Sequence, residues 1–263
     1  MLVGGCAHVP APGDIWDARA ARFVSAEDVY ARAARATHVI LGETHDNPEH
    51  HRLQRQALEH LPGPRALAME QFDSEHQSAI DAVQAKGADA EAIADAGRFD
   101  RKGWNWPLYR PLVEFAVEHR WPIIAANLSR AEARAIVRDP KSSDLPPAPV
   151  LAKELGRDIA ESHCGQPPPA QILAGMVEAQ RARDARMASR LRDRTVLITG
   201  TGHARRDRGV PVYSPGVDIV SIGFLEIDAD KGAAREYATG FFTAESFDYV
   251  WFTERAPRED PCK

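Results

Sequence analysis

Short apolar runs alternate along this chain with longer amphipathic segments. Runs that end at a glycine or a polar side chain predict buried strands, and apolar residues at helical spacing predict helices between them. The strands are expected at 39–42, 66–69, 122–126, from 195 to about 200, 217–227 and 249–253, and the helices at 25–36, 48–61, 75–84, 88–96, 107–119, 131–137, 150–162 and 170–192. The alternation predicts an α/β fold with a central, mostly parallel or mixed sheet flanked by helices.

One stretch departs from simple alternation. The helical region at about 128–193, between the third and fourth predicted strands, is longer than a crossover needs and predicts a helical lid or side subdomain. Residues 1–24, with many Ala, Pro and Gly in 7–24, are expected to form a tether, 25–254 the α/β domain and 255–263 a tail.

Composition excludes several classes of protein. The 263 residues carry a formal net charge of −5, without the basic excess expected when nucleic acid is the main partner. No apolar run reaches the length of a membrane span. Three cysteines without a C-x-x-C pattern argue against a disulfide framework or a thiolate zinc site, and whether Cys164 and Cys262 pair is left open.

The amino terminus suggests a lipid anchor. Residues 2–6 read L-V-G-G-C and resemble a bacterial lipobox, whose cysteine, here Cys6, becomes lipidated. Only five residues precede Cys6, too few for a signal peptide, so this interpretation expects the true start to lie upstream. It predicts a lipoprotein of the bacterial cell envelope that touches the membrane only through its anchor; the alternative is a cytoplasmic protein.

Two turns share the pattern G-x-x-H. The first, residues 42–45, follows a predicted strand and precedes a helix opened by Asn47 and Pro48. The second, residues 200–203, follows the strand that starts at 195. In an open α/β sheet such turns lie at the carboxyl edge, where ligands bind.

Polar side chains end four of the predicted strands. Glu43 with His45, then Glu70, Asn127 and His203 follow these strands in chain order. We expect two carboxylates and two imidazoles to meet in one crevice. For Asn127, a role as the cap of the helix at 131 is slightly favoured.

Two further patterns concern the walls of such a crevice. Gln180 and Asp184 interrupt an apolar helix face. Three interpretations are open, because buried polar groups need partners: the two residues face water, they line the pocket, or they hold an Arg or His of the 203–206 loop. A structural network is favoured. Trp104, Trp106, Tyr109 and Phe115 form an aromatic cluster, typical of a core but also suited to a flat apolar ligand. Tyr109 is expected to have a free hydroxyl, and a phenolate can ligate haem iron.

Five motifs in order resemble the ChaN-like haem-binding uptake proteins, a family related to the TIKI/TraB and erythromycin-esterase groups. They are L-G-E-T-H-D-N at 41–47, M-E-Q-F at 69–72, H-C-G at 163–165, Q-x-x-x-D-x-x-M-A at 180–188 and G-T-G-H-A-R-R-D-R-G-V-P at 200–211. The resemblance covers about 36–254.

This resemblance implies an envelope lipoprotein that acquires haem, works with an outer-membrane haem receptor and forms a homodimer around two haems. Family members use a tyrosine on the iron and a histidine of the partner on the propionates. The implied haem-binding residues are Tyr109 or, second, Tyr213 for the iron, and His163 (next, His203) for the propionates, with Arg206 in the same set.

The TIKI relatives imply an alternative, a metal-dependent hydrolase. His45 and His203 would then hold a divalent metal ion, and Glu43 or Glu70 would activate its water. The sequence leaves open whether the protein is an enzyme.

Overall fold

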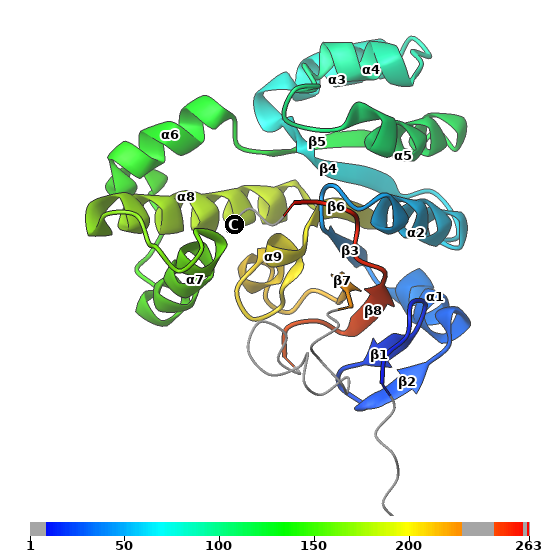
Figure 1. Ribbon diagram of the computed structural model, residues 1–263. Helices are drawn as coiled ribbons and strands as arrows, with labels where there is room; N and C mark the ends of the chain where they lie inside the picture. The colour runs from blue at the N-terminus through cyan, green and yellow to red at the C-terminus, as the bar shows by residue number, and fades with distance from the viewer. Residues whose placement is uncertain (1–8, 228–244, 260–261, 263) are drawn as a thin grey trace, which may run out of the picture.

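One mixed sheet organises the part of the chain that the structure, a computed structural model, describes: residues 9–227, 245–259 and 262 (Figure 1). The strand order is β2-β1-β8-β7-β3-β6-β4-β5. The strands are β1 Ile15–Asp17, β2 Arg22–Val24, β3 His38–Glu43, β4 Ala66–Asp73, β5 Ile123–Asn127, β6 Thr195–Gly200, β7 Ile219–Glu226 and β8 Tyr249–Thr253. From β8 to β5 all neighbours are parallel, so their carboxyl ends share one edge.

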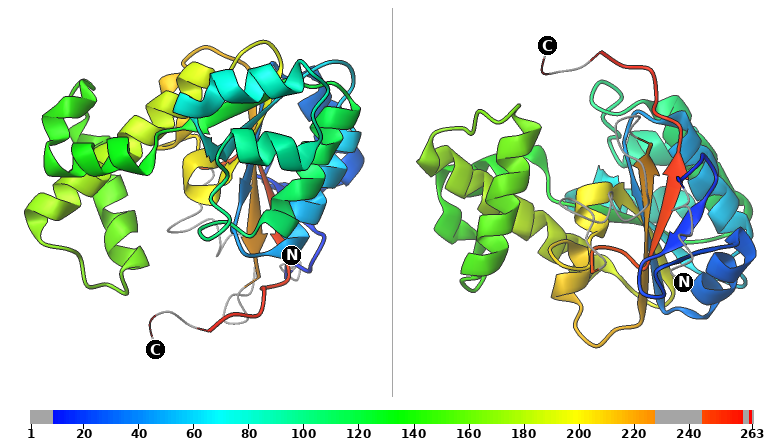
Figure 2. Two further views of the ribbon diagram at one scale, coloured as in Figure 1. Left: turned by 90° about the horizontal axis from the view of Figure 1, so that it is seen from above. Right: turned by 60° about the horizontal axis from the view of Figure 1, so that its bottom comes forward.

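Helices cover both faces of this sheet (Figure 2). They are α1 Ala26–Arg35, α2 Pro48–Glu59, α3 Gln77–Gln84, α4 Ala90–Ala96, α5 Trp106–Glu118, α6 Arg130–Arg138, α7 Pro149–Ser162, α8 Ala170–Arg190 and α9 Thr201–Ala204, with short 3-10 turns η1 Ser74–His76, η2 Pro140–Ser143 and η3 Val210–Tyr213. Strand side chains alternate between the two layers: Leu41 packs in the core with α1 to α5, and Ile40 in the core with the end of α8, α9 and η3.

The strand order matters most for the site. β6 lies between β3 and β4, with Glu43 opposite Gly200 and Met69 opposite Ile198. All six residues of β6 are buried, as are those of β3, which suits strands at the centre of a sheet covered on both sides. The parallel α/β prediction is therefore confirmed.

The predicted side subdomain is also present. Helices α6, α7 and α8 lie between β5 and β6 in the chain and stand to one side of the sheet (Figures 1 and 2). Leu128, Ile136 and Ala179 belong to a small core of their own. A Cβ on Gly175 would lie 2.2 Å from the carbonyl oxygen of Val137, so a glycine is needed for α6 and α8 to pack this closely.

Two local predictions are wrong. Residues 15–24, expected within a tether, form the antiparallel pair β1–β2, and β1 pairs with β8. Strands of three residues are too short to show a periodic pattern, and their pairing partner β8 is distant in the chain. The cap of α6 is Ser129, which forms a capping box with Glu132, and not Asn127.

Two of the three cysteines lie in the described part of the chain. Cys6, the expected lipidation site, lies outside the described residues. Cys164, just after α7, forms a disulfide with Cys262 in the carboxyl-terminal tail, which answers the question that the sequence left open. Among the described residues, no helix has both the length and the apolar character needed to cross a bilayer.

Candidate functional site

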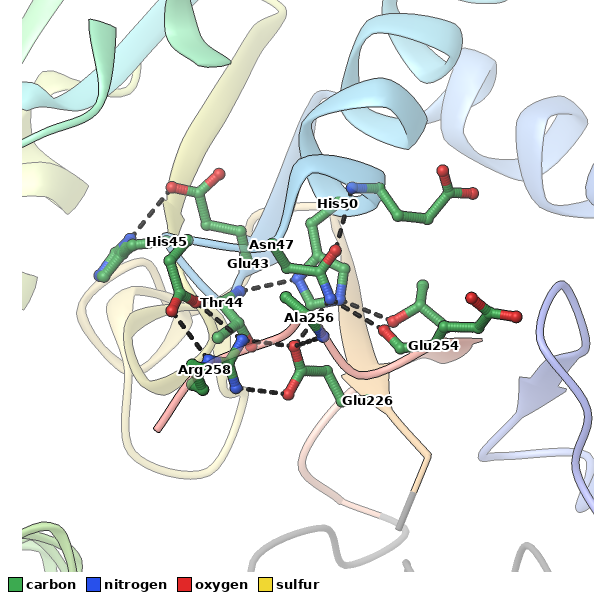
Figure 3. A network of polar contacts seen from close by, with 12 residues as sticks. Glu43, Thr44, His45, Asn47, His50, Glu226, Glu254, Ala256 and Arg258 are labelled. Carbon is green, nitrogen blue, oxygen red and sulfur yellow. Dashed lines mark hydrogen bonds and ion pairs between the residues drawn. The ribbon is translucent and has the colours of Figure 1, made fainter. Parts of the chain in front are cut away.

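The turn after β3 is fixed by the start of α2. The side chain of Asn47 caps this helix by accepting from the backbone N–H of Glu49 at 2.9 Å. Buried His50 accepts from the backbone N–H of Thr44 at 2.8 Å (Figure 3), and burial lowers the pKa of His50 to about 4. A neutral imidazole thus holds the turn that carries Glu43 and His45.

The carboxyl-terminal tail braces the same turn (Figure 3). Arg258 forms ion pairs with Asp46 at 2.8 Å and with Glu226 at 2.5 Å. Glu226 also accepts from the side-chain amide of Asn47 at 2.7 Å. These contacts join the last residues of β7 and the tail to the turn, so that a short loop keeps one conformation.

Glu43 is the centre of a buried cluster. Its carboxylate accepts from Tyr109 Oη at 2.7 Å and from Gln71 Nε2 at 3.3 Å, and it lies 3.0 Å from His45 Nδ1 and 3.2 Å from His51 Nδ1. Burial alone would raise the pKa of Glu43, but the neighbouring histidines and the bond from Tyr109 hold it below its ordinary value. The ionised carboxylate in turn raises the pKa of His45, although burial opposes that shift.

A second cluster surrounds His203. Its Nδ1 bonds Asp184 at 2.6 Å, and its Nε2 lies 3.4 Å from Glu70. Burial disfavours a charged ring, but the two carboxylates outweigh it and raise the pKa of His203 to about 10, while burial raises the pKa of Asp184 to about 6. Glu70 also accepts from Thr199 Oγ1 and from the backbone N–H of Gly200, and its pKa lies well below the ordinary value.

Gly200 connects the two clusters. A Cβ at this position would lie 2.9 Å from Cε1 of His45 and 3.7 Å from the carboxylate of Glu70. The expected crevice therefore exists: the two acids and two imidazoles from three separate strand ends meet at one edge of the sheet. Asp184 and Gln180 hold His203, which confirms the interpretation that they secure a histidine of the 203–206 loop.

A cavity of about 570 Å³ opens beside these clusters, between the sheet edge and the side subdomain. Its wall is both apolar and charged. It is lined by Glu70, Gln71, Asp73, Arg98, Asp100, Trp104, Asn127, Leu128, Arg130, Ala133, Arg134, Val137, Met176, Ala179, Gln180, Arg183 and His203. Volume and lining are those of a site for a ligand of moderate size.

The structure places the residues that the resemblance implied for haem in different surroundings. Tyr109 has no exposed surface, and its hydroxyl is bonded to Glu43 and not free as expected. Tyr213 is half-buried on η3, His163 is exposed after α7 with its ring bonded to the carbonyl of Ile159, and Arg206 pairs with Asp248. None of these four lines the cavity described above.

The metal hypothesis receives no geometric support at His45 and His203. Within residues 9–227, 245–259 and 262, the group whose ligand atoms lie close enough to hold an ion is Asp73, Glu75 and His76. Glu75 in that group is exposed, and acidic surface groups of this kind are common without a metal.

Several site residues escaped the sequence analysis. His51 contacts Glu43, and Arg98, Arg134 and Arg183 line the cavity. His51 follows His50 at the start of the helix after the first G-x-x-H turn, so its position was a usable signal. The arginines carried no such signal, because an arginine on an amphipathic helix, like Arg134 and Arg183, or in a turn, like Arg98, is ordinarily a solvent-exposed residue.

A family model and a solved structure point to the same family of proteins. A family model described as haem-binding uptake, Tiki superfamily, ChaN matches residues 29–213. A solved structure of cofacial haem binding to ChaN of Campylobacter jejuni has 25% sequence identity and a TM-score of 0.75, over 90% of this chain and 95% of that one.

Other structural similarities are weaker. A Bacillus cereus protein shares 10% identity at a TM-score of 0.48, over 87% of this chain and 90% of that one. RRSP, a MARTX toxin effector domain from Vibrio vulnificus, shares 16% identity at 0.42, over 74% of this chain and 35% of that one. Neither carries an argument about function. A search of curated proteins returns no match.

Proposed function

The chain belongs to the haem-binding uptake family of the Tiki superfamily, ChaN, and from that premise we propose that it binds haem in the cavity between the sheet edge and the side subdomain. The observation that carries the proposal is the composition of the cavity wall. Leu128, Val137 and Met176 offer apolar surface and Trp104 an aromatic face, while arginines stand among them. A planar apolar macrocycle with two carboxylates needs both kinds of contact.

His45, which lies beside Trp104 at the margin of the cavity and is not among the residues that line it, supplies a position for the iron. Its ring is 44% exposed and lies 4.7 Å from the ring of Trp104, a residue of the cavity wall. Nδ1 bonds the buried carboxylate of Glu43, and Nε2 makes no hydrogen bond with any residue that the structure describes. A carboxylate that fixes one nitrogen and leaves the other for a metal is the usual arrangement around metal-binding histidines.

We therefore propose His45 Nε2 as an iron ligand, with Tyr109 acting on it through Glu43. The resemblance implies a tyrosine as the iron ligand. To fill that role, Tyr109 would have to break its hydrogen bond to Glu43 and reach the cavity surface. Burial and the neighbouring carboxylate raise the pKa of Tyr109, which opposes formation of a phenolate. Haem bound here would be carried and released.

Titration of the purified protein with haemin tests this function. We expect a saturable shift of the Soret band at one haem per chain, and a changed spectrum in the variant His45→Ala. The control is His60→Ala, because His60 is exposed beside Tyr30 at the far end of α2. A wild-type protein without saturable haemin binding would contradict the proposal, and an unchanged spectrum in His45→Ala would remove His45 as ligand.

We propose a homodimer that serves haem uptake or trafficking in the bacterial envelope, with a lipid anchor on Cys6 and an outer-membrane haem receptor as its partner. The support is the family and the lipobox-like residues 2–6. Metabolic labelling with a palmitate analogue tests the anchor. The molecular mass in solution, measured by sedimentation with and without haemin, tests the dimer.

A further inference from the structure

The arginines of the cavity wall differ in how they are paired. Arg130 forms an ion pair with Asp100 at 2.7 Å and is thereby neutralised. Arg134 makes no hydrogen bond or ion pair through its side chain with any described residue, and Arg183 donates only to the amide oxygen of Asn127, at 3.2 Å. Arg134 and Arg183, like Arg98 in the turn after α4, therefore line the cavity without a carboxylate partner in the described part of the chain.

These two arginines come from facing helices. Gly175 lies against Val137, and Arg186 pairs with Glu132, so α8 and α6 run antiparallel to one another. That register brings Arg134, one turn from the start of α6, level with the part of α8 that holds Ala179 and Arg183, and all three line the cavity. The two positive charges thus stand on the same wall.

The carboxylates on the wall leave this pair of charges largely uncompensated. Glu70 lies beside the imidazolium of His203, and Asp100 beside Arg130. Asp73 remains; burial raises its pKa, the charge of Arg183 opposes that shift, and no ion pair joins the two side chains in the described part of the chain. An incoming anion would therefore find two guanidinium groups whose planar donors match a carboxylate well.

We propose that Arg134 and Arg183 form a subsite for the two carboxylates of a planar ligand, which are the propionates if the ligand is haem. The inference rests on the proposed function and adds the orientation of the ligand to it. The carboxylate edge faces α6 and α8, and the macrocycle extends toward Trp104 and the sheet edge. The subsite selects a free diacid over its ester.

Metal-free protoporphyrin IX isolates the carboxylate contacts, because it has both propionates and no iron. Its binding is measured by quenching of tryptophan fluorescence, next to that of its dimethyl ester. We expect the wild type to prefer the diacid, and Arg134→Gln and Arg183→Gln each to weaken diacid binding about tenfold, the effect of losing one charged hydrogen bond. Ester binding should stay unchanged in both variants.

Arg138→Gln is the matched control. Arg138 belongs to the last turn of the same helix, is exposed and does not line the cavity. Its diacid affinity should equal that of the wild type. Circular dichroism establishes that each variant is folded, and the ratio of diacid to ester affinity in the wild type tests the subsite without any variant.

The possible failures are distinguishable. If the wild type binds haemin but holds diacid and ester equally well, or if both arginine variants bind the diacid like the wild type, the subsite is wrong and haem binding stands. If the wild type binds neither haemin nor the porphyrins, the proposed function fails, and the subsite fails with it.

Discussion

The hydroxyl of Tyr109 donates to Glu43 at 2.7 Å, across 66 positions of the chain. It joins α5 to the carboxyl end of β3. Through Glu43 it also reaches His45, whose Nδ1 lies 3.0 Å from the same carboxylate oxygen. A residue that looks like an iron ligand in the sequence is thus, in the fold, a group that orients another candidate ligand.

The first prediction concerns this chain of contacts. Tyr109→Phe should lower the free energy of unfolding by about 1–2 kcal/mol, because buried Glu43 loses one donor. The haem-bound spectrum should keep its ligand pattern, since Phe retains the packing against Trp104 and His51. Denaturant unfolding and absorbance spectroscopy measure both effects. A loss of the iron-ligand signature in Tyr109→Phe, but not in Tyr213→Phe, would restore Tyr109 as the ligand.

Gly200→Ala tests the contact between the two clusters. The added Cβ would meet Cε1 of His45 at 2.9 Å, and this exposed ring can move away at small cost. We expect a stability change below about 1 kcal/mol but a clear loss of haemin affinity. Gly202→Ala is the control, because a Cβ there meets nothing within 4 Å. Equal haemin affinity in the two variants would contradict the assignment of His45.

The pH dependence of stability should reveal His203. Its pKa is raised in the folded protein to about 10 from an ordinary value of 6.5, so its stabilising contribution is fully present below pH 6.5 and is lost as pH rises toward 10. His203→Gln should flatten this alkaline decline. For Glu70 the folded pKa is lowered, so its contribution is lost as pH falls below about 4.5. Urea unfolding of the wild type and of His203→Gln across pH 6–10 measures the alkaline decline. Parallel stability curves for the two proteins would refute the contribution of His203.

The disulfide between Cys164 and Cys262 closes a long loop, since the two cysteines lie 98 positions apart. In the chain-entropy account, its removal lowers the free energy of unfolding by roughly 3–5 kcal/mol. Chemical denaturation with and without a reductant measures this effect. The double variant Cys164→Ser/Cys262→Ser is the control and should no longer respond to the reductant. A wild-type stability that is indifferent to the reductant would show that the bond does not form.

Much of the local structure was predictable because its causes are local. The apolar runs of β3 and β6 and the Asn47-Pro48 start of α2 act over a few residues, and their elements appear where expected. The polar residues that end those strands were recognisable for the same reason. The strands β1 and β2 were missed because their stability comes from pairing with each other and with β8.

The sequence by itself determined the α/β class, the family and the four polar residues Glu43, His45, Glu70 and His203. Only the tertiary structure decided how these residues are connected. Insertion of β6 between β3 and β4 sets Gly200 between His45 and Glu70, and the packing of α6 on α8 creates the cavity wall. Strand order and helix packing depend on contacts between distant segments, and a local pattern of apolar and polar residues does not encode which segments will meet.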